Sequence, residues 1–184
     1  QLTLARTESQ SIRKKLHNET LRALTDTLTG LPNREAFDER FNLARDRFLR
    51  YKHPASLAIL DIDHFKLVND NHGHLVGDRV LQAFAATVKN MTRSTDFLAR
   101  FGGEEFVLIM PETDTNSAQA LLEKIRISIA EMAPKNLGTQ NPITVSSGLA
   151  AFQLGEKAEQ LVERADKALY RAKDAGRNQV EIAE

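Results

Sequence analysis

The residues best suited to chemistry are two adjacent acids that follow two glycines, in the run Gly102-Gly103-Glu104-Glu105. Glycines permit a tight turn with positive φ and leave the backbone bare, so that a bulky ligand can come close to it. Adjacent carboxylates beside such a turn suit a hard cation such as Mg²⁺. The alternative is an ordinary hairpin turn with solvated acids, and these four residues alone do not separate the two interpretations.

A second acidic segment, Asp61-Ile62-Asp63-His64-Phe65-Lys66, begins at the end of an apolar run that is typical of a buried strand. An acid at the end of a central strand is costly to bury unless a cation or a metal ion compensates its charge. Asp61 is therefore a stronger candidate for a functional site than a surface acid.

The elements that must position these acids follow from the spacing of apolar residues. The run 106–110 predicts a buried strand, paired across the two glycines with a strand at about 97–100. Other strands are expected at 56–61 and 143–152, with a short edge strand at 179–182. Amphipathic patterns predict helices at 34–52 after an Asn33 cap, 76–91, 118–129 and 158–175.

The connecting segments carry weaker signals. A short helix after Lys66 is expected to reach Asp70, and residues 71–74, with His72 and His74, are interpreted as a loop rather than a metal-binding pair. Residues 134–142 contain Gly, Asn and Pro and predict a loop or a weak hairpin. Residues 1–28 lack Gly and Pro and carry a thin apolar seam, which predicts a helix that is either solvated or a stalk shared with a partner copy.

These elements predict one domain, residues 29–184, with an N-terminal helical linker at 1–28. Strands that return through hairpins and helices favour an α+β fold of ferredoxin-like kind, in which helices flank a mostly antiparallel central sheet.

Composition excludes several classes of protein. The 184 residues contain 25 Lys and Arg and 25 Asp and Glu, and this zero net charge argues against a nucleic-acid partner. The absence of Cys excludes disulfides and thiolate metal sites. With no signal peptide and no apolar run long enough to span a bilayer, we expect no direct membrane contact within this fragment and a cytoplasmic location. Because the chain starts at Gln1 rather than Met, we also expect a longer parent protein, in which another segment could attach to a membrane.

Five motifs, in this order, resemble the GGDEF family of diguanylate cyclases over residues 26–182. They are Asp26-Thr27-Leu28-Thr29-Gly30-Leu31-Pro32-Asn33-Arg34; Asp61-Ile62-Asp63-His64-Phe65-Lys66-Leu67-Val68-Asn69-Asp70; Gly73-His74 with Gly77-Asp78; Gly102-Gly103-Glu104-Glu105-Phe106; and Ala168-Leu169-Tyr170-Arg171-Ala172-Lys173 with Gly176-Arg177-Asn178. The resemblance implies a nucleotidyl-cyclase-like fold and an enzyme that joins two GTP molecules into cyclic di-GMP, releasing two pyrophosphates. Glu104, where the family name has Asp, is a common active variant.

The resemblance also implies a role for each site residue. Asp61, the Ile62 carbonyl and Glu104 would hold Mg²⁺, with Mn²⁺ as an alternative ion, and Glu105 would help to deprotonate the attacking hydroxyl. Gly102 and Gly103 complete the catalytic set. The triphosphate would be bound by the backbone N–H groups of His64 and Phe65 and the side chains of Lys66, Lys173 and Arg177, and guanine by Asn69 and Asp78.

Several of these residues have ordinary structural explanations. Lys173 and Arg177 lie near a helix C-terminus, where the helix dipole alone favours cations. Asn69 is also typical of a turn, and Asp78 of the acidic start of a helix.

Arg93 and Asp96 resemble the family's inhibitory site, which binds a stacked dimer of the product. The alternative for this pair is a surface salt bridge. Lys124 stands where a third, arginine contact is usual, and Arg126 is the other candidate for that contact.

The reaction itself implies a partner copy. Each GTP is both attacker and target, so the simplest arrangement is a homodimer in which two sites face each other.

Two other functions compete with catalysis as an interpretation of this sequence. A catalytically silent receptor for GTP or cyclic di-GMP would be expected to lack some of the acids that are intact here. An RNA-binding sheet would need exposed aromatic residues and a basic face, whereas this chain is 6% aromatic and has no net charge.

Overall fold

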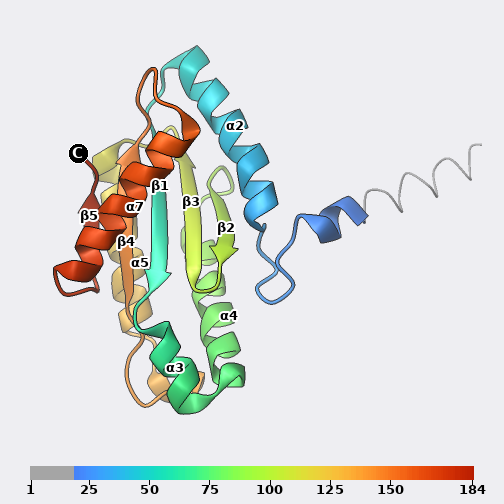
Figure 1. Ribbon diagram of the computed structural model, residues 1–184, viewed down its shortest axis with the longest axis vertical. Helices are drawn as coiled ribbons and strands as arrows, with labels where there is room; N and C mark the ends of the chain where they lie inside the picture. The colour runs from blue at the N-terminus through green and yellow to red at the C-terminus, as the bar shows by residue number, and fades with distance from the viewer. Residues whose placement is uncertain (1–18) are drawn as a thin grey trace, which may run out of the picture.

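The structure is a computed structural model that describes residues 19–184 (Figure 1). Its centre is a five-stranded sheet in the order β2-β3-β1-β4-β5. All neighbouring strands are antiparallel except the parallel pair β4 and β5. The strands are β1 (Ala55–Ile62), β2 (Phe97–Gly102), β3 (Glu105–Pro111), β4 (Val145–Ala151) and β5 (Val180–Ile182). The prediction of a mostly antiparallel α+β sheet of ferredoxin-like kind is confirmed.

Helices cover both faces of this sheet, as Figure 1 shows. Helices α4 and α5 pack on one face, and α2 and α7 pack on the other. The helices are α2 (Arg34–Tyr51), α3 (Phe65–His72), α4 (His74–Met91), α5 (Thr115–Ala130), α6 (Pro134–Leu137) and α7 (Ala158–Asp174). Asn33 caps α2 as expected, since its side chain accepts a hydrogen bond from the N–H of Ala36 at 3.1 Å.

The alternation of side chains along the buried strand β1 sets the direction in which Asp61 points. Side chains alternate along a strand, so Leu60 and Ile62 join the core under α4 and α5, whereas Leu57 and Ile59 join the core under α2 and α7. Asp61 continues the second series. Its carboxylate therefore points to the side of the sheet that α7 covers.

Three connecting segments differ from the predictions. The expected loop at 71–74 is wrong: α3 runs to His72 and α4 starts at His74. The single residue between them, Gly73, turns the chain with a φ of +80°, which glycine adopts without strain. The weak hairpin considered for 134–142 is also wrong, because this segment contains the helical turn α6.

The third difference is at the N-terminal helix. Residues 19–23 are helical, but Thr25 pairs with Pro32 in a β-bridge, so the expected helix does not reach residue 28. The part of that prediction that falls on residues 1–18 lies outside the described residues. Within residues 19–184, no helix is long and apolar enough to cross a bilayer.

Candidate active site

The predicted catalytic acids meet at one end of the sheet. Asp61 near the end of β1 lies directly opposite Glu105 at the start of β3, and Glu104 occupies the turn before it. The Lys173 ammonium, on α7, lies 2.9 Å from the Asp61 carboxylate. These groups border a cavity of about 200 Å³ lined by Asp61, Asp63, His64, Phe65, Lys66, Glu104, Lys173 and Arg177. The structure thus brings the predicted metal and triphosphate residues together.

The carboxylates in this site oppose one another electrostatically. Burial raises the pKa of Asp61, and the hydrogen bond and charge of Lys173 only partly oppose this effect. Burial, followed by the negative charge of Asp61, also raises the pKa values of Glu104 and Glu105. A bound cation would relieve both the burial of negative charge and the repulsion.

The donor set fits a magnesium ion that is shared with a phosphate ligand. Across residues 19–184, no three or more His, Cys, Asp or Glu side chains are arranged to hold a metal ion by themselves. Mg²⁺ is usually bound by one or two carboxylates together with substrate phosphates and water, rather than by a cage of protein groups. Asp61 and Glu104, which both line the cavity, are two carboxylates of the kind that such a smaller set requires.

Two backbone corners with positive φ border the cavity, and the one at His64 is suited to an anion. His64 precedes α3 with a φ of +56°, and the first N–H groups of a helix have no partner within the helix. Arg177 and Asn178, after α7, also adopt positive φ. Each such non-glycine residue costs about 1–2 kcal/mol, so other contacts must hold these corners in place.

Asp63, which was not among the predicted site residues, provides those contacts. One carboxylate oxygen accepts from the Ser146 hydroxyl at 2.7 Å. The other accepts from the Thr144 hydroxyl at 2.7 Å and from the backbone N–H of Asn178 at 3.0 Å. Asp63 therefore joins β1, β4 and the loop that carries Arg177. Its place in an acidic run was the only sequence signal, because Asn178 is 115 residues away.

The two predicted guanine contacts lie outside this cavity, where α3 packs on α4. A Cβ added to Gly77 would lie 2.0 Å from the Asn69 side-chain oxygen, so the Asn69 amide lies directly against this glycine. Asp78 is the next residue on α4. A larger residue at position 77 would displace the Asn69 amide from the place where it lies.

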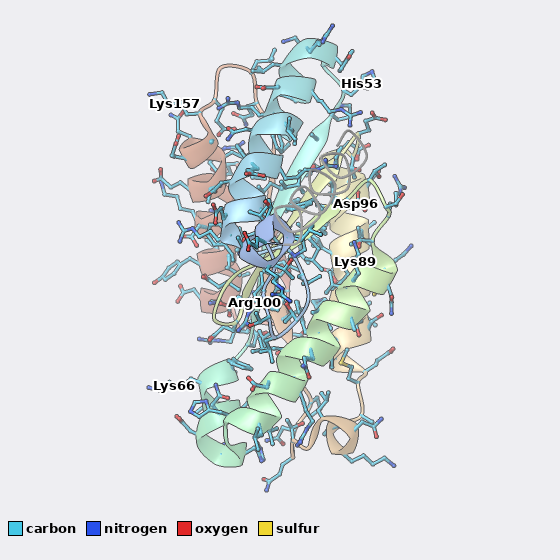
Figure 2. All side chains as sticks on the ribbon, turned by 90° about the vertical axis from the view of Figure 1, so that its right-hand side faces the viewer. His53, Lys66, Lys89, Asp96, Arg100 and Lys157 are labelled. Atoms are coloured by element: carbon cyan, nitrogen blue, oxygen red, sulfur yellow. The ribbon has the colours of Figure 1, made fainter. Side chains whose placement is uncertain are left out.

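The predicted inhibitory residues are separate from the cavity. Along the long axis of the molecule, Arg100 lies between Asp96 and Lys66 (Figure 2). Asp96 is buried, and one of its oxygens accepts from the backbone N–H of Arg93 at 2.8 Å. The other oxygen is buried with no hydrogen-bond partner among the described residues. Among residues 19–184, the side chains of Arg93 and Asp96 form no ion pair, so the surface salt bridge considered for them is absent there.

The third inhibitory contact has two candidates on α5. Arg126 is engaged, since it bonds to Glu123 at 2.7 Å and to the Asn178 side chain at 3.1 Å. Lys124 is exposed. Of the two side chains, Lys124 is the one that is free to turn toward a ligand.

Comparison with known proteins places this site in a family. Residues 23–179 match the profile described as "Diguanylate cyclase, GGDEF domain". Diguanylate cyclase DgcP of Pseudomonas aeruginosa is 46% identical over 96% of this chain, and DgcM of Escherichia coli is 39% identical over 95%. The chain spans 26% of the length of DgcP and 41% of the length of DgcM.

Solved structures agree with these relatives. The coiled coil and GGDEF domain of DgcB from Caulobacter crescentus, in complex with c-di-GMP, superposes with a TM-score of 0.92 at 37% identity, over 99% of this chain and 97% of that one. The active GGEEF domain of a Vibrio cholerae diguanylate cyclase superposes with a TM-score of 0.77 at 34% identity, over 83% of this chain and 97% of that one. This chain belongs to the GGDEF family of diguanylate cyclases.

Proposed function

We propose that this chain condenses two GTP molecules into cyclic di-GMP and two pyrophosphates. The observation that carries the proposal is the cavity in which Asp61 and Glu104 lie beside Lys66, Lys173 and Arg177. Carboxylates suit a metal ion and the three cations suit a triphosphate, so one site accommodates both parts of a metal–GTP complex.

The chemistry would be in-line transfer to an α-phosphorus. The 3′-hydroxyl of one GTP attacks the α-phosphorus of the other, an oxygen–phosphorus bond forms, and the bond to pyrophosphate breaks. Mg²⁺, or Mn²⁺ as the alternative ion, would be held by Asp61, the Ile62 carbonyl and Glu104 and would neutralise phosphate charge. Glu105 accepts the hydroxyl proton, a role that suits a carboxylate whose pKa is raised by burial.

Lys173 has two partners available in this scheme. It neutralises Asp61 in the described structure at 2.9 Å, and its ammonium borders the cavity. A triphosphate there would compete for this cation. Lys66, Arg177 and the backbone N–H groups of His64 and Phe65 would bind the remaining phosphate oxygens.

Guanine would be read by Asn69 and Asp78. A carboxylate accepts hydrogen bonds from the ring N–H and the amino group of guanine, and an amide bonds to its edge. Adenine offers a different pattern of donors and acceptors. The pair therefore favours GTP over ATP.

The proposal also includes the assembly and its control. A homodimer places two such sites face to face, with residues 29–184 as the catalytic domain and residues 1–28 as a linker. Product would bind at Arg93, Asp96 and Lys124. A GTP-dependent reaction fits a cytoplasmic location.

The test is to incubate the chain with GTP and Mg²⁺ and to separate the nucleotides by chromatography. We expect cyclic di-GMP to form and added cyclic di-GMP to slow the reaction. The rival interpretation, a silent receptor, predicts that GTP or cyclic di-GMP binds and that GTP is recovered unchanged.

A further inference from the structure

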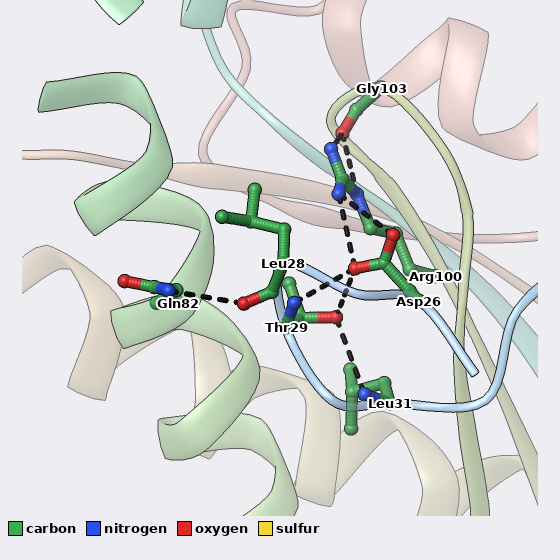
Figure 3. Close-up of polar contacts among 7 residues, drawn as sticks. All are labelled: Asp26, Leu28, Thr29, Leu31, Gln82, Arg100 and Gly103. Carbon is green, nitrogen blue, oxygen red and sulfur yellow. Dashed lines mark hydrogen bonds and ion pairs between the residues drawn. The ribbon is translucent and has the colours of Figure 1, made fainter. Parts of the chain in front are cut away.

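The side chain of Arg100 joins two loops that are far apart in the sequence (Figure 3). Its Nε and Nη2 both donate to the Gly103 carbonyl, at 3.0 and 2.7 Å. Its Nη1 donates to both carboxylate oxygens of Asp26, each at 3.1 Å. The Arg100 side chain is only 15% exposed, so this guanidinium is well shielded from solvent.

The turn that Arg100 contacts has two other backbone contacts, the pairing of Gly102 with Glu105 and a long hydrogen bond of 3.4 Å from the Ile62 N–H to the Glu104 carbonyl. Gly103 has a φ of +43°, and a Cβ built on Gly102 or Gly103 would have no atom within 4 Å. Two glycines give the turn the greatest conformational freedom of any residue pair. Because the Gly103 carbonyl belongs to the peptide that leads into Glu104, the hydrogen bonds from Arg100 fix the direction in which Glu104 leaves the turn.

Asp26, the other partner of Arg100, is itself held firmly. One of its oxygens accepts from the backbone N–H of Thr29 at 2.9 Å and from the Thr29 hydroxyl at 2.6 Å. Burial alone raises the pKa of Asp26, but the bonds from Thr29 and Arg100 outweigh it and lower the pKa below its ordinary value. The same loop is tied to α4, since the Gln82 side chain donates to the Leu28 carbonyl at 3.1 Å.

We propose that Arg100 and Asp26 are positioning residues that hold Glu104 in place as a metal ligand. The inference rests on the proposed function, which makes Glu104 such a ligand. Groups that orient a metal ligand typically change metal affinity or activity about 10–100-fold when they are removed. Arg100 acts here through the backbone, and Asp26 sets the orientation of Arg100.

The chain contains a matched control for a purely structural role. Arg164 also pairs with a carboxylate, Glu156, at 2.6 Å, and donates to a backbone carbonyl, that of Ala151, at 2.6 Å. Its side chain is 20% exposed, close to the value for Arg100. It lies at the other end of β4 from Ser146, away from the cavity.

The experiment compares Arg100→Lys with Arg164→Lys in the whole chain. Lysine keeps the positive charge but cannot reach the carbonyl and the carboxylate together, because it lacks the planar fork. Hydrogen exchange measures the amides at 103–105, and electron paramagnetic resonance measures Mn²⁺ binding in the presence of 3′-deoxy-GTP. Steady-state kinetics with GTP then separates kcat from KM.

For Arg100→Lys we expect exchange at 103–105 to be about tenfold faster, Mn²⁺ binding about tenfold weaker, kcat lower and the KM for GTP within about twofold of wild type. Arg164→Lys should lower the melting temperature without these changes. Asp26→Asn keeps the shape of the side chain and loses its charge. Like Arg100→Lys, it should make exchange at 103–105 faster and Mn²⁺ binding weaker.

The proposal is overturned if Arg100→Lys has the same hydrogen-exchange rates at 103–105 and the same Mn²⁺ affinity as Arg164→Lys. If Arg100→Lys does not fold, the same comparison with Asp26→Asn decides. Neither of these measurements needs turnover. A wild-type chain that converts no GTP would contradict the proposed function, and the exchange and Mn²⁺ results would still decide the roles of Arg100 and Asp26.

Discussion

Single residues in this site are arranged for ligand binding at a cost in stability. Glu104 lies beside buried Asp61, and its pKa is raised above the ordinary value of 4.5 by burial and then by the charge of Asp61. A carboxyl whose pKa is raised on folding contributes stability below its unfolded pKa. That contribution is lost as the pH rises through the folded-state pKa. At neutral pH, ionised Glu104 therefore opposes folding when no metal is bound.

This leads to a prediction for Glu104→Gln. In EDTA near neutral pH, the variant should melt at a higher temperature than the wild type. The difference should shrink as the pH falls through the folded-state pKa of Glu104, which burial raises, because wild-type Glu104 then becomes protonated. The same variant should lose turnover by at least roughly 100-fold, since the proposed function makes Glu104 a metal ligand. Calorimetric melting over this pH range checks the first part. A variant that is less stable than the wild type at every pH would contradict the electrostatic explanation.

Base selection is also a property of single residues. Asp78→Ala should raise the KM for GTP roughly tenfold or more, because guanine donors lose a charged acceptor, and it should narrow the preference for GTP over ATP. The comparison is with Asp46→Ala, which removes an exposed acid from α2. If competition assays give Asp78→Ala the same GTP preference as Asp46→Ala, Asp78 does not read the base.

At the scale of elements, hydrophobic pattern was a good guide wherever an element is buried. The run 106–110 and the apolar residues before Asp61 predicted β3 and β1 because strands buried on both faces have few polar residues. The predicted ends of helices were wrong where a single residue separates two elements, as Gly73 separates α3 from α4. Contacts such as Asp63 with Asn178, or Arg100 with Asp26, could not be predicted, because pairing between distant polar residues leaves no periodic signal.

The seating of α7 on the sheet gives an element-scale prediction. A Cβ at Gly148 would lie 2.0 Å from the Ala165 carbonyl and 2.3 Å from the Leu169 backbone nitrogen, so Gly148→Ala must push α7 away from β4. We expect a loss of roughly 1–3 kcal/mol in the free energy of unfolding. Because Lys173 is carried on α7, the KM for GTP should rise as well.

The control for this prediction is Ala150→Gly, which weakens the same strand without adding volume under α7. Denaturant unfolding measures both variants, and kinetics measures KM. An unchanged KM in Gly148→Ala, at a stability loss equal to that of Ala150→Gly, would show that the position of α7 does not control substrate binding.

At the scale of the whole molecule, residues 19–184 of one copy hold one constellation of site residues, whereas the proposed reaction needs two GTP molecules. Specific activity should therefore rise with enzyme concentration below the dimerisation constant, and removal of residues 1–24 should lower activity most in dilute solution. Activity assays from nanomolar to micromolar enzyme, with light scattering on the same samples, measure this. A flat specific activity in samples that stay monomeric throughout would contradict the dimer.

The most direct measurement is the stoichiometry of the products formed from GTP and Mg²⁺. The account predicts one cyclic di-GMP and two pyrophosphates for every two GTP molecules consumed, and no product when EDTA is present or when Glu104→Gln replaces the wild type. A folded wild-type chain that binds GTP yet returns it intact, or hydrolyses it to GDP or GMP, would contradict the assignment of Asp61, Glu104 and Glu105 to cyclic di-GMP synthesis.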